Sequence, residues 1–247
     1  HPSPEFAERV RREKVYINDG EVKSLKKCID LLAEKDLIGL LRFTEKWVVV
    51  NCPYSFADKP HSIIYLDKEK VQLNLTIADD WNAKLWKTGP EIRDFSGQIA
   101  FRSERSIPNL LRIILHEIGH MVEYKVLDFS WRGEFLANNL NREFVSISWD
   151  EEQNWKDREN MLQRLHEIET RAELEEFINW FKNDSFFFSV YSGTGMNEDF
   201  AESFVYYYLF ERFGYSLDLT VDGETIVSHL QKINDGRRRK LQFIAEI

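Results

Sequence analysis

The chain has 247 residues, of which 43% are hydrophobic and 14% aromatic, and its formal net charge is −9. This length and apolar content are enough to bury a sizeable core, which excludes an intrinsically disordered protein. The acidic balance argues against a nucleic-acid partner, because contacts with phosphates need a basic surface. The sequence contains neither a long apolar run nor the pattern of a signal peptide, so we expect no membrane span.

The N-terminal part of the chain is expected to be helix followed by a small twisted sheet. Residues 6–41 are predicted to be helical, since Val22, Leu25 and Ile29 fall close to a period of 3.6 residues. Short β-type runs follow between residues 43 and 101, namely WVVVN, HSIIYL, VQLNLTI and SGQIAF. The segments CPYSFADKP and LDKEK between them have the composition of turns.

The chain from residue 106 onward is expected to be mainly helical. NLLRIILHEIGHMVEYKVL is apolar on nearly every side, which is typical of a helix buried in a domain. Residues 150–182 form an acidic amphipathic helical region whose charges face solvent. The sequence then predicts a β-like segment, FFFSVY, a glycine loop, SGTGMN, and a second buried helix, EDFAESFVYYYLFERFG, that ends at Gly214.

Cys28 and Cys52 are the two cysteines. Neither lies in a CxxC pair or near a histidine at the spacing of metal ligands. They are expected to be ordinary small residues, with one isolated disulfide as the alternative.

The motif HEIGH, residues 116–120, indicates a metal-binding site with a catalytic base. His116 and His120 are four residues apart on one helix face, so both can reach one metal ion, and Glu117 beside them can take a proton from a water at the metal. The alternative is a pair of core histidines. Three polar residues inside this apolar run would be costly to bury without partners, and a metal ion would satisfy both imidazoles. We therefore predict two metal ligands and a general base.

A catalytic zinc ion usually has three protein ligands and keeps a fourth position for water. The extended motif HExxHxxGxxH is absent, because Glu123 stands at the glycine position and Val126 at the third histidine. Glu123 and Asp128 lie too close along the same element to close around the ion. A carboxylate from elsewhere in the chain is therefore expected as the third ligand.

The better source of this ligand is NEDFAESF, where Glu198 and Glu202 share one face of the second buried helix. Glu198 could also complement the helix dipole without a metal, whereas Glu202 lies among aromatic residues and needs a buried partner. One acid that binds the metal and one that orients a ligand imidazole would account for both residues. Spacing alone leaves open which acid has which role.

Together these residues resemble a known family. HEIGH, then Tyr191, then Glu198 seven residues later within EDFAESF, look like the pattern of the anthrax lethal factor catalytic domain and the secreted Pro-Pro endopeptidases. That pattern is HExxH, then a tyrosine, a gap, and E-x-F-A-E-x-F. The resemblance is confined to these two short blocks. The segment between them, residues 127–185, is longer and more charged than such a domain needs, and His166 and Glu167 within it are expected to be surface residues.

The resemblance implies an α+β, zincin-like fold and a zinc metalloendopeptidase of the gluzincin type, secreted or delivered to a host cell. The roles it implies are zinc ligands His116, His120 and Glu198, general base Glu117, oxyanion donor Tyr191, and Glu202 as the acid that orients a ligand imidazole. We expect one Zn²⁺ per chain and a single metallopeptidase domain over residues 1–247. In this domain a helix and sheet lobe, 1–105, packs on a helical lobe, 106–247, that completes the zinc site.

Three interpretations are weighed. The first is an endopeptidase acting on a protein or extended peptide, which an exposed edge strand would hold by main-chain hydrogen bonds; SGQIAF, residues 96–101, is the candidate strand. The second is a protease-like binding or regulatory domain with structural zinc and little turnover, and the third is a helical domain without metal. Glu117 and Tyr191 favour the enzyme, since a structural site needs neither, although Tyr191 has core packing within FFFSVY as its alternative.

Overall fold

A computed structural model of the chain describes residues 17–72, 99–102, 108–127, 139–149, 168–215, 218–227 and 234–247. These residues form an α+β structure that is mainly helical, with small three-stranded sheets, so the predicted class is confirmed. No helix in these segments is both long and apolar enough to cross a lipid bilayer.

The N-terminal elements form one helix and a mixed sheet. Helix α2 (Asp19–Glu34) begins after Asn18, whose side chain accepts hydrogen bonds from the amides of Gly20 and Glu21. After the 3₁₀ helix η1 (Ile38–Phe43), the sheet consists of β1 (Lys46–Val50), β2 (Phe56–Asp58) and β3 (Ile63–Asp67). The strand order is β1-β3-β2, with β1 parallel and β2 antiparallel to β3. The predicted strands WVVVN and HSIIYL are confirmed, and the predicted helix is confirmed from residue 19 to residue 34; residues 6–16 lie outside the described chain.

The two turns predicted for this region, at CPYSFADKP and LDKEK, are wrong. CPYSFADKP contains the strand β2, which is too short to show an alternating pattern, although Phe56 and Ala57 are buried in the sheet. LDKEK ends in the short helix α3 (Lys68–Gln72), and this helix also contains the first two residues of the predicted strand VQLNLTI. The Asp67 carboxylate starts α3 by accepting a hydrogen bond from the amide of Glu69 over 3.0 Å. Residues 73–77 lie outside the described chain.

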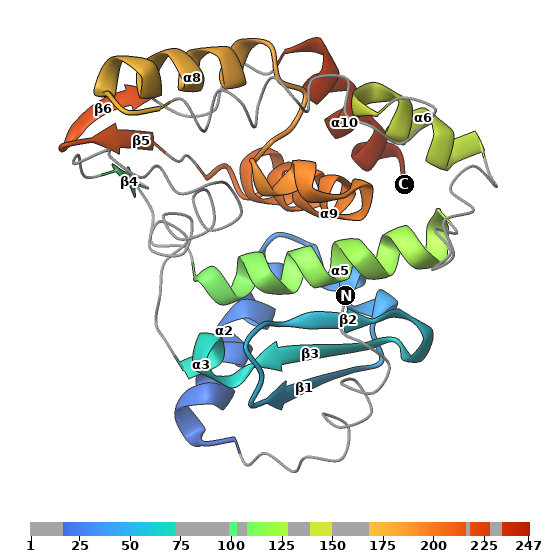
Figure 1. Ribbon diagram of the computed structural model, residues 1–247. Helices are drawn as coiled ribbons and strands as arrows, with labels where there is room; N and C mark the ends of the chain where they lie inside the picture. Colours follow the sequence, from blue (N-terminus) through green and yellow to red (C-terminus); the bar gives the residue numbers. More distant parts are fainter. Residues whose placement is uncertain are drawn as a thin grey trace.

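Helix α5 (Asn109–Val126) lies between this sheet and helix α9 (Met196–Tyr206) (Figure 1). Both predicted buried helices are confirmed, and α9 continues as a π-helix, η4 (Tyr207–Arg212), before Gly214 at φ 65°. Gly119 explains how closely α5 and α9 pack. A Cβ atom at this position would lie only 3.1 Å from the Cα of Ala201. The glycine inside HEIGH thus lets the two motif-bearing helices approach each other.

The outer elements cover α9 on the side away from α5 (Figure 1). They are the helices α6 (Asn139–Ser148), α8 (Arg171–Asn183) and α10 (Asp235–Glu246). The acidic helix predicted over residues 150–182 is confirmed from residue 171 to residue 182, while 150–167, including His166 and Glu167, lies outside the described chain. A second sheet, with order β4-β5-β6, is antiparallel and consists of β4 (Ile99–Arg102), β5 (Asp218–Val221) and β6 (Glu224–Val227). SGQIAF is therefore a strand from residue 99, and residues 96–98 are not described.

The prediction of a β-like segment at FFFSVY is wrong. Phe187 and Phe188 are buried in the core, and the chain then enters a 3₁₀ helix, η3 (Tyr191–Thr194), rather than a strand. Arg237 of α10 donates one hydrogen bond to the carbonyl of Phe187 in this segment and another to the carbonyl of Phe181 in α8. A run of buried aromatic residues therefore forms without a β partner.

Cys28 and Cys52 are not joined in a disulfide. Cys28 is buried in the main hydrophobic cluster, and Cys52 in a small separate cluster with Val50, Phe56 and Tyr65. Burial raises the pKa of the Cys28 thiol to about 12, so the group is protonated at neutral pH. The interpretation as ordinary small residues holds, and the alternative of an isolated disulfide does not.

Candidate metal centre

His116 and His120 project from α5 toward Glu198 in the first turn of α9. Nε2 of His116 lies 3.1 Å from Oε2 of Glu198, and Nε2 of His120 lies 3.6 Å from the same oxygen. The three ligand atoms all lie within 4.8 Å of one another. Both imidazoles are buried, and the Glu198 side chain keeps 21% of its surface exposed. The group can therefore hold a metal ion.

A test of this fit is whether the polar atoms of the three side chains all have hydrogen-bond partners without a metal. Oε2 of Glu198 is buried and has no hydrogen-bond partner, although two imidazole nitrogens lie beside it. The approach is close but lacks the geometry of a hydrogen bond. Two imidazole nitrogens and one carboxylate oxygen are a donor set that suits a divalent transition-metal ion. The residues present thus fit a metal, and an ion would satisfy the orphaned oxygen.

Nδ1 of His116, the ring nitrogen on the side away from Glu198, is hydrogen-bonded to Glu202, the second acid of α9. Nδ1 of His116 donates a hydrogen bond to Oε1 of Glu202 over 3.0 Å. Glu202 is almost completely buried and also accepts hydrogen bonds from Ser189 over 2.9 Å and from Arg112 over 3.4 Å. The two acids that spacing could not distinguish therefore lie on opposite edges of one imidazole, with Glu198 at Nε2 and Glu202 at Nδ1.

Nδ1 of His120, the ring nitrogen on the side away from Glu198, is hydrogen-bonded to Glu123, a role that the sequence pattern did not indicate for this residue. Nδ1 of His120 donates to Oε2 of Glu123 over 3.2 Å, and the same oxygen accepts a hydrogen bond from Nζ of Lys59 over 2.9 Å. Glu123 had been weighed only as a ligand. Its spacing of three residues from His120 is the signal that could have identified it, whereas nothing in the sequence pairs it with Lys59, 64 residues away.

Glu117 and Tyr191 lie beside the cluster. Glu117 follows His116 on α5 and is buried, and the ring of Tyr191 lies 5.9 Å from the ring of His116, centre to centre. Burial, together with the negative charges of Glu198 and Glu202, raises the pKa of the Tyr191 hydroxyl above its usual value. The hydroxyl is therefore protonated at neutral pH and can act as a donor. Tyr191 is only partly buried, which does not match a side chain that serves the core alone.

The charges of the cluster are strongly coupled. Burial by itself would lower the pKa of His120, but the nearby negative charge of Glu198 and the hydrogen bond from the ring to Glu123 outweigh it and raise this pKa to about 10. Burial would raise the pKa of Glu198, but the two histidines hold it well below its usual value. A metal ion at this position would take the place of the proton on His120, so metal uptake releases protons.

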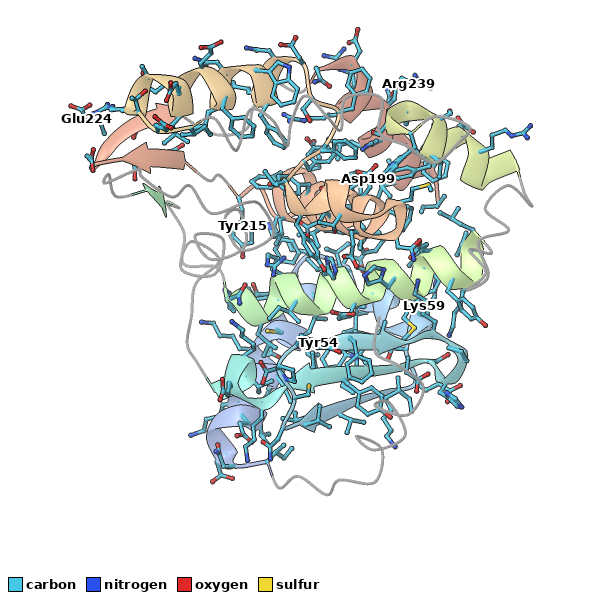
Figure 2. The ribbon with its side chains drawn as sticks, viewed as in Figure 1. Tyr54, Lys59, Asp199, Tyr215, Glu224 and Arg239 are labelled. Atoms are coloured by element: carbon cyan, nitrogen blue, oxygen red, sulfur yellow. The ribbon has the colours of Figure 1, made fainter. Side chains whose placement is uncertain are left out.

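Asp199, next to Glu198, anchors the start of α9 and was not identified from the sequence. Its carboxylate accepts hydrogen bonds from Nζ of Lys240 over 2.5 and 2.7 Å and from Nε1 of Trp149 over 3.1 Å. Asp199 and Lys240 are both completely buried, and Figure 2 labels Asp199 on α9, on the side that faces α10. This buried pair fixes the turn of helix that carries Glu198.

The predicted substrate strand belongs to the second sheet. Among the described residues, β4, which contains residues 99–101 of SGQIAF, is a terminal strand of the β4-β5-β6 sheet. β2 is an edge of the other sheet and contacts α5 directly. The helix with the two histidines therefore packs against the first sheet.

Comparisons of the chain with protein-family models, with curated proteins and with solved structures found no match.

Proposed function

We propose that the chain is a zinc-dependent endopeptidase that hydrolyses peptide bonds in a protein or extended-peptide substrate. The convergence of His116, His120 and Glu198 on one point carries the proposal. A carboxylate and a tyrosine beside them supply the further groups that hydrolysis needs. The proposal includes one Zn²⁺ per chain, a zincin-like fold of the gluzincin type related to lethal factor and the Pro-Pro endopeptidases, and secretion or delivery to a host cell.

The number of ligands supports catalysis over a structural role. In the described part of the chain, the group that can hold an ion contains three ligand residues. Structural zinc sites are closed by four protein ligands, whereas catalytic sites use three and leave a position open for water or substrate. Zinc suits two imidazoles and a carboxylate, and the ion would supply Lewis acidity toward water and a peptide carbonyl.

The residues around the ion have complementary tasks in peptide hydrolysis. Glu117 takes the proton from the attacking water and passes it to the leaving amine as the peptide bond breaks. Tyr191, kept protonated by burial and by neighbouring carboxylates, donates a hydrogen bond to the oxyanion that develops on the carbonyl oxygen. Glu202 holds the His116 ring with Nε2 toward Glu198.

The test combines metal content with identification of cleaved bonds. Purified chain and the Glu117→Ala variant are incubated with candidate host or bacterial proteins, and new N-termini are identified by mass spectrometry. The proposal expects about one zinc per chain in both proteins. New N-termini are expected with the parent chain only, and a metal chelator should abolish this cleavage. Zinc in both proteins with no cleavage in either would favour the alternative, a protease-like binding or regulatory domain. Absence of zinc would contradict both.

A further inference from the structure

A buried ion pair connects the N-terminal sheet to the metal centre. Lys59 begins the 3₁₀ helix η2 (Lys59–His61), which follows β2, and its side chain reaches Glu123 of α5 between the sheet and the helix (Figure 2). The two side chains are 2% and 0% exposed. Both donors of Glu123, Lys59 and His120, converge on its Oε2, while its Oε1 is buried without a hydrogen-bond partner.

A gain in folding stability alone is a weak explanation for burying the ion pair of Lys59 and Glu123. Removing two charges from water costs several kcal/mol per ion, and apolar side chains of similar volume often stabilise a protein as well or better. Glu123 also lies on a helix whose neighbouring positions, Met121 and Val122, are buried apolar residues. An apolar side chain at position 123 could not accept a hydrogen bond from Nδ1 of His120, as Glu123 does.

The two ligand imidazoles are held in the same way by separate groups. Nδ1 of His116 donates to Glu202, which Arg112 contacts at 3.4 Å. Nδ1 of His120 donates to Glu123, which Lys59 contacts at 2.9 Å. Each imidazole therefore has its own buried carboxylate, and each carboxylate has its own buried cation.

We propose that Glu123 and Lys59 are positioning residues of the metal centre. Glu123 fixes the tautomer and the plane of the His120 ring, so that the Nε2 lone pair points toward Glu198. Lys59 holds the Glu123 carboxylate in place and so makes the edge of the N-terminal sheet part of the support of the site. The inference rests on the proposed function, because it concerns how the proposed ligand His120 is held.

The test measures zinc affinity of the metal-free protein by competition with a chromophoric chelator. Loss of a carboxylate that supports a ligand histidine typically weakens metal binding by about ten- to a hundredfold, and this is the loss expected for Glu123→Gln. The matched control is Glu21→Gln. Glu21 is a carboxylate on α2 that is also completely buried; it accepts hydrogen bonds from Asn18 and lies 3.8 Å from Nζ of Lys68, on a helix that carries none of the proposed metal ligands. This control is expected to leave zinc affinity unchanged.

Lys59 is tested through a double-mutant cycle. Lys59→Met should weaken zinc binding, Lys59→Arg should retain it, and the double variant of Lys59→Met with Glu123→Gln should bind zinc no more weakly than Glu123→Gln alone. The visible spectrum of bound Co²⁺ gives a second readout, since a reoriented His120 ring changes the ligand field, whereas a loss of stability alone does not. Circular dichroism confirms that each metal-free variant is folded, and Lys59→Met carries the test if Glu123→Gln does not fold.

Three outcomes would overturn the inference: Glu123→Gln with the zinc affinity of Glu21→Gln, a Co²⁺ spectrum identical to that of the parent, or losses from Lys59→Met and Glu123→Gln that add. Failure of the proposed function is distinguishable, because it is seen in the parent protein itself, which would then bind no zinc, lose none on His116→Ala, or bind zinc and cleave no substrate.

Discussion

Nδ1 of His116 donates a hydrogen bond to Glu202 over 3.0 Å, while Nε2 of the same ring lies 3.1 Å from Glu198. One imidazole therefore separates the two acids of α9 and gives them different surroundings. Glu202 is 2% exposed and has further partners in Ser189 and Arg112, whereas Oε2 of Glu198 has no hydrogen-bond partner. This difference sets the predicted roles of the two residues.

Glu198→Gln and Glu202→Gln should weaken zinc binding to different extents. Glu202→Gln removes the charge that holds the His116 ring and should cost about ten- to a hundredfold in affinity, while Glu198→Gln opens the ligand set and should cost more. Metal titration of both variants measures the order. If Glu202→Gln is the more damaging, the two roles are reversed.

His116→Ala should remove most of the zinc, because an imidazole that approaches Glu198 to 3.1 Å is lost. His120→Ala should do the same. Metal analysis after dialysis against a metal-free buffer gives the zinc content of each variant and of the parent. A full equivalent of zinc in the His116→Ala protein would show that the ligands are elsewhere.

Glu117→Ala should abolish proteolysis and leave zinc bound, since in the proposed mechanism Glu117 acts as the general base and does not ligate the ion. The measurement is cleavage of a substrate protein by samples with equal zinc content. Near-parental activity in this variant would rule out Glu117 as the base.

Tyr191→Phe should keep the fold and the zinc and lower the rate of cleavage by about a hundredfold, the usual scale for one lost oxyanion donor. The substitution removes a hydroxyl from a partly buried ring that lies 5.9 Å from His116 and leaves its packing intact. Single-turnover kinetics with saturating enzyme isolate the chemical step. An unchanged rate would assign Tyr191 to packing.

Gly119→Ala should lower both the free energy of unfolding and the zinc affinity. The added Cβ would lie 3.1 Å from the Cα of Ala201, a backbone atom that cannot move without shifting α9. Overpacking of this kind costs about 1–3 kcal/mol, against a gain in helix propensity of about 1 kcal/mol. Urea unfolding measures the net loss. Gly39→Ala is the control, because no atom lies within 4 Å of the Cβ position there; equal effects of the two substitutions would exclude the close approach of the helices.

Helix periodicity and the two motif blocks were enough to predict α5 and α9, because each helix is long and its apolar residues are continuous. The same local reasoning failed at FFFSVY, where Arg237, 50 residues from Phe187, donates a hydrogen bond to the carbonyl of Phe187. Lys59 could not be predicted for a similar reason. Its partner Glu123 is 64 residues away, and an exposed lysine in a turn has the same local sequence as a buried one.

The pair formed by Asp199 and Lys240 implies an order of events during synthesis. The ribosome synthesises the two histidines first and Glu198 later. Lys240, which neutralises Asp199, follows 41 residues after Asp199. Until Lys240 has left the exit tunnel and α10 has docked, the turn that carries Glu198 would have to bury an uncompensated carboxylate, which is strongly unfavourable. Metal loading is therefore expected to be a late, post-translational step that follows α10, and zinc uptake by ribosome-stalled chains that stop before or after this helix would show the difference.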